Sequence, residues 1–168
     1  MTPAAARELS QRELAAALAG GRGFDPRGIA GWVYRGTSLG LPGWIERLTW
    51  TKFAKAFHRE VGGHVRGWNV RIEQDGLDRA WRPRMRHGRA ITFGRFTVVE
   101  AATGIVLDYH VERGPMQVLR DPLVALDDRA DTLLGRSFVQ LGPASIPTPS
   151  YFLLEHDERV VDPLPALG

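Results

Sequence analysis

Beyond its first 63 residues, this chain repeats its apolar residues with a period of two, the spacing of half-buried β-strands. In the segment 68–73 the apolar Trp68, Val70 and Ile72 alternate with polar side chains, and segment 105–112 repeats the pattern. Because successive side chains of a strand point to opposite faces, each segment presents one apolar face to a core. The pattern therefore predicts a strand-rich fold for most of the chain.

Other strand-like segments share a content of β-branched and aromatic residues, and turn-forming pairs such as Asp75-Gly76 and Thr103-Gly104 separate them. They are residues 28–36, 90–100, 115–120, 133–141 and 150–156. About seven to nine short strands at intervals of roughly 8 to 14 residues are typical of an antiparallel barrel or sandwich. We expect a single domain over 1–168, because this length suffices for one core.

Two segments have helical spacing. Ser10 stands three residues before Glu13 in the arrangement of a capping box, so we expect a short helix and a loop within residues 1–27. Residues 44–58 carry apolar side chains on two arcs of a helical wheel. This predicts a second helix, 44–58, that lies as a lid between the strands and another body such as a ligand.

Composition excludes several classes of site. The chain has no cysteine, which rules out disulfides, zinc–thiolate sites and a cysteine nucleophile.

No apolar run approaches the roughly 20 residues of a membrane-spanning helix. Arg7 and Glu8 stand where a signal peptide would be apolar, so we expect a cytoplasmic protein. The net charge is +3, and Lys52 and Lys55 are the two lysines among 22 basic residues.

Several passages together carry a likeness to a known family. They are Trp32-Val-Tyr-Arg-Gly36, Pro42 with Lys55-Ala-Phe57, an acidic turn and leucine–glycine strand at 127–135, and an aromatic strand at 149–155. Over about residues 29–157 the chain resembles the bacterial GXWXG proteins, small lipocalin-like barrels mostly of unknown function. It departs from their motif, since Trp32 stands at the first glycine and Tyr34 at the tryptophan.

The resemblance implies a lipocalin-like β-barrel over residues 28–157, followed by a tail at 158–168. Such a barrel would hold a hydrophobic or amphipathic small molecule in its cavity. We expect its lining to come from aromatic residues and from two polar groups that could orient a ligand. They are Tyr34, Trp50, Phe57, Trp68 and Tyr109, with Asn69 and Arg95. The alternative is that these aromatic side chains are ordinary core.

Asp108, His110 and Glu112 share one face of the predicted strand 105–112. A histidine between two carboxylates could act as a general base or join a metal site. Asp108 and His110, or Tyr109 as proton donor, would then serve a cofactor-free isomerase, cyclase or hydratase. The alternative is that this face is the outside of the barrel and that Tyr109 points inward.

No cofactor or metal is expected. The spacing of His58 and His64 matches no standard metal motif, and residues 36–40 lack the lysine–hydroxyl pair of a phosphate-binding loop. A serine nucleophile has no support either, because Ser137 lacks the glycine that would follow it two residues later in a nucleophile elbow.

An arginine run at 79–95 is the strongest hint of nucleic-acid binding. Arginine binds phosphate through two parallel hydrogen bonds, and Trp81 within the run could stack on a base. Arg82, Arg84 and Arg86 recur at period two, however, so a solvated strand face is the simpler explanation, with an anionic headgroup site as a further alternative. We expect a small-molecule ligand rather than nucleic acid as the partner, and a homodimer is compatible with the sequence.

Overall fold

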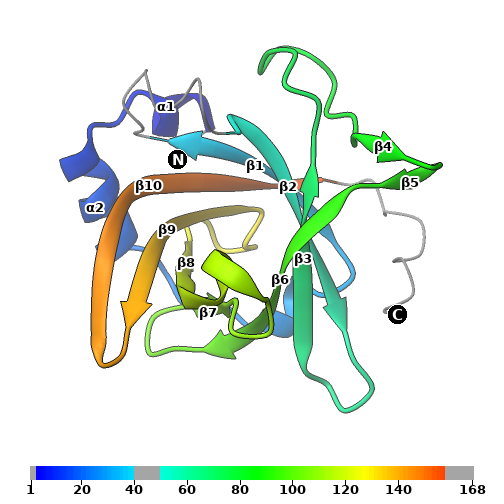
Figure 1. Ribbon diagram of the computed structural model, residues 1–168. Helices are drawn as coiled ribbons and strands as arrows, with labels where there is room; N and C mark the ends of the chain where they lie inside the picture. Colours follow the sequence, from blue (N-terminus) through cyan, green and yellow to red (C-terminus); the bar gives the residue numbers. More distant parts are fainter. Residues whose placement is uncertain (1–2, 40–49, 158–168) are drawn as a thin grey trace.

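The computed structural model describes residues 3–39 and 50–157. In this part of the chain eight antiparallel strands close a barrel in the order β1-β10-β9-β8-β7-β6-β3-β2 (Figure 1). The strands are β1 Val33–Leu39, β2 Lys52–Arg59, β3 Val65–Arg71, β6 Thr92–Glu100, β7 Ile105–Asp108, β8 Leu119–Ala125, β9 Thr132–Leu141 and β10 Ala144–Asp157. Strands that follow one another along the chain are neighbours in the barrel, which confirms the predicted lipocalin-like architecture.

Short elements decorate this barrel. The helix α2, Gln11–Ala19, begins at the predicted capping box, in which Ser10 and Glu13 each accept a backbone N–H of the other residue. The remaining elements are helix α1 Pro3–Arg7, the 3₁₀ helices η1 Pro26–Gly28 and η2 Gly114–Val118, and the strand pair β4 Met85–Arg86 and β5 Arg89–Ala90. We call residues 72–91, which carry β4 and β5, the arm.

The predicted helix 44–58 is wrong where the structure describes it. Residues 52–59 form β2, whereas residues 44–49 lie outside the described residues. In β2, Phe53 and Phe57 face the barrel interior and Ala54 packs on the outside beneath the arm. A strand buried on both faces loses the polar–apolar alternation, so its apolar side chains imitate a helix that is apolar on two arcs.

Most predicted strands differ by several residues from the observed ones, for example 28–36 from β1 and 150–156 from the longer β10. Two others differ in kind or in where they end. The predicted strand 115–120 is a 3₁₀ helix at 114–118, where Pro115 cannot donate to a strand ladder, and β8 begins at Leu119. The predicted strand 105–112 ends at Asp108, but its inward face extends to Tyr109, which is 1 % exposed. Ile105 and Leu107 point inward as predicted.

Apolar side chains fill only one half of the barrel. The chief interior members of this cluster are Tyr34, Phe57, Phe96, Ile105, Leu107, Leu123, Leu133 and Leu154, all of which are buried. Tyr34 donates a hydrogen bond from its hydroxyl to the Ala130 carbonyl, 3.0 Å away. This half is the closed end of the barrel, and it leaves the other half to the site described below.

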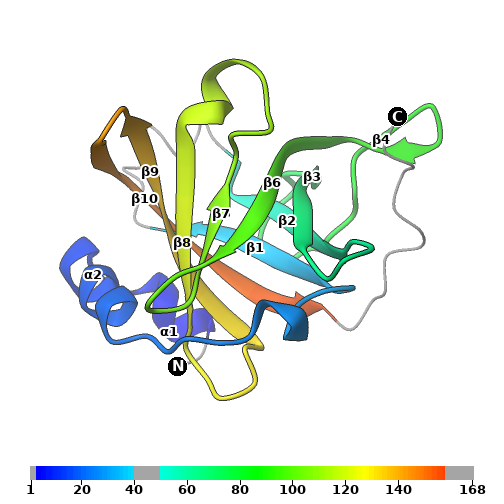
Figure 2. The ribbon, with the colours of Figure 1, turned by 90° about the horizontal axis from the view of Figure 1, so that it is seen from below.

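Helices α1 and α2 lie on one side of the barrel and the arm on the opposite side (Figures 1 and 2), and each covers an apolar cluster on the outside of the wall. Helices α1 and α2 pack Ala6 and Leu14 against Tyr151 and Leu153 of β10. On the other side, Trp68 of β3 lies in the cluster beneath the arm. Both contacts bury apolar surface. Each Å² of apolar surface removed from water stabilises the fold by about 25 cal/mol, so the helices and the arm stabilise the barrel from outside.

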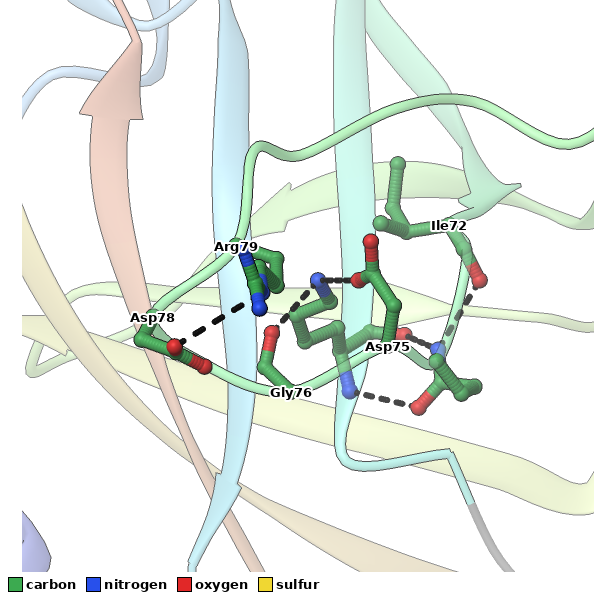
Figure 3. A network of polar contacts seen from close by, with 7 residues as sticks. Ile72, Asp75, Gly76, Asp78 and Arg79 are labelled. Atoms are coloured by element: carbon green, nitrogen blue, oxygen red, sulfur yellow. Dashed lines mark hydrogen bonds and ion pairs between the residues drawn. The ribbon is translucent and has the colours of Figure 1, made fainter.

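The arm is fastened to the barrel by Lys52 at the start of β2. Its ammonium group donates hydrogen bonds to the Asp75 carboxylate at 2.5 Å and to the Gly76 carbonyl at 2.7 Å (Figure 3). Gln74 exchanges hydrogen bonds with the backbone of Lys52, at 3.0 and 2.6 Å. Lys52 is 1 % exposed, so this lysine serves the attachment of the arm rather than a solvated surface.

Two glycines make room for the rings that line the open half. A Cβ at Gly36 would lie 2.2 Å from the Phe53 ring, and a Cβ at Gly135 would lie 2.3 Å from the Phe152 ring. The Phe53 ring of β2 and the Phe152 ring of β10 meet edge to face across β1, with centroids 5.9 Å apart. Each ring therefore lies over a glycine of the neighbouring strand, where no side chain occupies the space.

We predict that Gly135→Ala displaces the Phe152 ring and lowers the free energy of unfolding by about 1–3 kcal/mol. Denaturation in urea would measure this loss. Gly28→Ala is the control, because a Cβ there meets nothing within 4 Å. Equal stability of the two variants would contradict the packing described here.

Candidate functional site

The open half of the barrel holds a cavity of about 400 Å³. Its walls are mostly apolar and come from strands all around the barrel. They are Trp50, Phe53, Phe93, Met116, Leu119, Pro149 and Phe152, with hydroxyl side chains at Ser38, Ser137, Thr148 and Ser150. Small side chains at Ser137 and Ser150 leave space where larger ones would fill the barrel.

Four polar side chains line the cavity where it meets the closed end, and we call them the floor: Lys55, Asn69, Tyr109 and Asp121. The Lys55 ammonium donates to Asn69 Oδ1 at 2.8 Å and to Tyr109 Oη at 2.6 Å. It also lies 3.5 Å from Asp121 Oδ2, to which the Tyr109 hydroxyl donates at 3.0 Å. Asn69 donates to the Gly94 carbonyl at 3.1 Å. The floor is thus one connected hydrogen-bond network.

This network spans the whole barrel. Lys55 belongs to β2 and Asp121 to β8, and four steps separate these strands around the eight-strand barrel in either direction. The two residues therefore reach toward each other from opposite walls. Asn69 on β3 and Tyr109 after β7 complete the network from the strands between them.

Burial sets the proton chemistry of the floor. Desolvation lowers the pKa of Lys55, and the nearby Asp121 carboxylate opposes that shift. Desolvation, followed by the charge of Asp121, raises the pKa of Tyr109 well above its usual value of 10. Tyr109 is therefore a neutral phenol at physiological pH, able to donate to Asp121 while accepting from Lys55.

Aromatic rings surround the Lys55 ammonium. It lies 5.0 Å from the centroid of the Phe152 ring and 5.4 Å from those of Phe53, Phe96 and Tyr109. Ring faces attract a cation, so they compensate part of the hydration that the ammonium loses on burial. Lysine fits this position because its charge is compact, whereas an arginine fork needs more room and more acceptors.

Three of the residues expected to line the cavity do so: Trp50, Asn69 and Tyr109. Asn69 points inward because the polar face of β3 turns to the barrel interior, and Trp68 consequently lies outside it. At the mouth, the Arg71 guanidinium stacks on Trp50, 4.7 Å from the ring centroid.

The structure places the other expected lining residues elsewhere. Tyr34 and Phe57 belong to the closed end of the barrel, and Trp68 belongs to the cluster beneath the arm. Arg95 lies on the surface, where its Nε is 3.2 Å from Glu112. These four residues do not contact the cavity.

Asp108 and His110 meet, but on the outside of the barrel. The Asp108 carboxylate lies 3.0 Å from His110 Nδ1 and 3.0 Å from the Arg120 guanidinium. The His110 side chain is 55 % exposed to solvent. Of the residues expected to do acid–base chemistry, Tyr109 is therefore the one that the fold brings into the cavity.

Sequence reasoning missed Lys55 and Asp121. One signal was present: the chain has 20 arginines and two lysines, and both lysines are buried at positions with specific partners. Nothing marks Asp121 in the sequence, since Asp121-Pro122 also fits a turn. Its role depends on a partner 66 residues away in the chain.

The arginine run lies away from the cavity. Arg84, Arg86 and Arg89 are exposed on the arm, which projects from the side of the barrel (Figure 2). Trp81 is half-buried and packs with Trp68 on the barrel wall. A larger hollow of about 580 Å³ lies between Arg35 and this arm, but its walls are largely charged.

Comparison with known proteins adds no relative. No protein-family model matches the chain, and no curated protein is significantly similar to it. The resemblance to the GXWXG proteins therefore stays a prediction.

Within the described residues no helix has the length and apolar character needed to cross a membrane. The cytoplasmic location and the homodimer likewise stay predictions.

We predict that Lys55→Met lowers the free energy of unfolding by about 3–5 kcal/mol, because it leaves the Asp121 carboxylate buried without a charged partner. Asp121→Leu should cost a similar amount. The double variant Lys55→Met/Asp121→Leu should recover most of the loss, since no buried charge remains. Urea denaturation of the four proteins measures the coupling, and additive losses would contradict the pairing.

Proposed function

We propose that this protein binds an amphipathic small molecule in the open half of the barrel. One observation carries the proposal: the apolar walls above the floor border a cavity of about 400 Å³, whereas a core cluster of the described residues packs the other half. An apolar cavity of this size falls within the range of small-molecule sites, about 300–1,000 Å³. A chain that needed only stability would fill this space, because each unfilled methylene costs stability.

The arrangement also orients the ligand. Phe53, Phe93 and Phe152 offer rings to an apolar body, whereas Tyr109 and Asp121 offer polar atoms to one end. A polar ligand group at the floor can therefore replace the water that would otherwise hydrate these atoms. We infer that the ligand enters with its polar group first and its apolar part toward the mouth.

We predict that N-phenyl-1-naphthylamine, a neutral apolar dye, binds with increased fluorescence at one site per chain. Met116→Trp narrows the cavity and should weaken this binding by about tenfold, or 1.4 kcal/mol. Val61→Trp is the control, since Val61 is fully exposed and distant from the lining. Absence of binding, or equal binding by both variants, would overturn the proposal.

A second candidate function uses the same cavity for cofactor-free, non-redox catalysis, such as the isomerisation of a carbonyl compound. The observation that favours it is the series Lys55–Tyr109–Asp121, in which three ionisable groups are hydrogen-bonded inside a cavity. Asp121 would take a proton from the carbon next to the carbonyl and would then no longer need the hydrogen bond from Tyr109. The Tyr109 hydroxyl would turn to the enolate oxygen and stabilise it. If the substrate is a β,γ-unsaturated ketone, Asp121 returns the proton to the γ-carbon and the double bond shifts into conjugation with the carbonyl.

Deuterium exchange tests this second candidate. The protein should speed the exchange of the protons next to the carbonyl of decan-2-one in heavy water, as followed by NMR. Asp121→Asn should remove the acceleration and Asp108→Asn, on the barrel surface, should keep it. Exchange at the same rate with and without protein would reject the catalytic function and leave the binding function standing.

A further inference from the structure

One carboxylate oxygen on the floor has no partner among the described residues. Asp121 Oδ2 accepts from Tyr109 and faces Lys55, but Asp121 Oδ1 is buried and has no hydrogen-bond partner in the described part of the chain. The whole residue is 3 % exposed, and it lines the cavity. A buried acceptor without a donor is costly, so a donor that entered the cavity and reached this oxygen would remove that cost.

The floor offers no matching site for an anion. Lys55 directs its donors to Asn69 Oδ1, Tyr109 Oη and Asp121 Oδ2, within 3.5 Å of each. An entering carboxylate would therefore have to displace one of these acceptors, and it would meet the free oxygen of Asp121. Two carboxylates that lie beside the same ammonium group in an apolar cavity repel each other strongly.

The charge of the floor sums to zero. Among described residues, the ionisable groups that line the cavity are Lys55, Tyr109 and Asp121. The formal charges of Lys55 and Asp121 are opposite and cancel, so the pair adds no net charge to the cavity. Tyr109 stays an uncharged phenol. A cationic ligand would add an unbalanced charge beside Lys55, just as an anionic ligand would beside Asp121.

We propose that the ligand is an uncharged amphipathic alcohol, whose hydroxyl donates a hydrogen bond to Asp121 Oδ1 while its apolar body lies against Phe53, Phe93 and Phe152. This inference rests on the proposed binding function and specifies its ligand class. An alcohol supplies the missing donor without adding charge. An ether or ester of the same length fills the same space but supplies no donor.

Four ligands of one chain length test the proposal by displacing the naphthylamine dye from the wild-type protein: decanol, decyl methyl ether, decanoate and decylamine. Decanol should displace the dye at a concentration at least about tenfold below that of each of the others. Equal or tighter binding of decanoate or of the ether would overturn the inference. Dye that does not bind, together with no heat of binding for any of the four ligands in calorimetry, would instead overturn the proposed function.

Asp121→Asn supplies an independent arm. The amide removes the negative charge, so the floor then carries the unbalanced charge of Lys55 and should favour an anion. We expect the ratio of decanoate to decanol affinity to rise by at least about tenfold relative to wild type. Asp108→Asn, which changes a carboxylate outside the barrel, should leave the ratio unchanged. An unchanged ratio in a folded Asp121→Asn variant would contradict the role of Asp121, and the wild-type series decides the question if that variant does not fold.

Discussion

The structure depends on the pairing of Lys55 with Asp121 across the inside of the barrel. These residues come from strands on opposite walls, and both are almost fully buried. A buried ion pair adds little stability by itself, because each charge loses its hydration, but the loss of one partner is expensive. The pair therefore penalises any arrangement that separates these two walls, and it lies where the barrel interior changes from packed to open.

This arrangement divides one barrel into two functional halves. Below the floor, rings such as Phe57 and Phe96 meet edge to face and exclude any ligand. Above it, the small side chains of Ser137 and Ser150 line the wall, so the strands continue while the space between them stays unfilled. The closed half, the helices and the arm supply the burial that the open half lacks.

Sequence patterns predicted the barrel because its outer strand faces are partly solvated. The alternation at 105–109 predicted β7 and its inward face, and the capping box at Ser10 predicted the start of α2, because both patterns depend only on residues close in the chain. The strand β2 was mistaken for a helix. The arm covers its outer face, so that face is apolar and the sequence shows no alternation of polar and apolar residues. Tyr109 was recognised from an apolar ring with a polar tip at an inward position. Asp121 could not be, because its meaning comes from a partner on the opposite wall rather than from its neighbours in the chain.

The central claim is that the open half is a ligand cavity whose floor is the Lys55–Asp121 network. A crystal structure of the protein with decanol tests it most directly. The account predicts elongated density along Phe53 and Phe152, with the hydroxyl within hydrogen-bond distance of Asp121 Oδ1 and Lys55 still facing Asp121. A cavity closed by its own side chains, or decanol bound only outside the barrel, would contradict it.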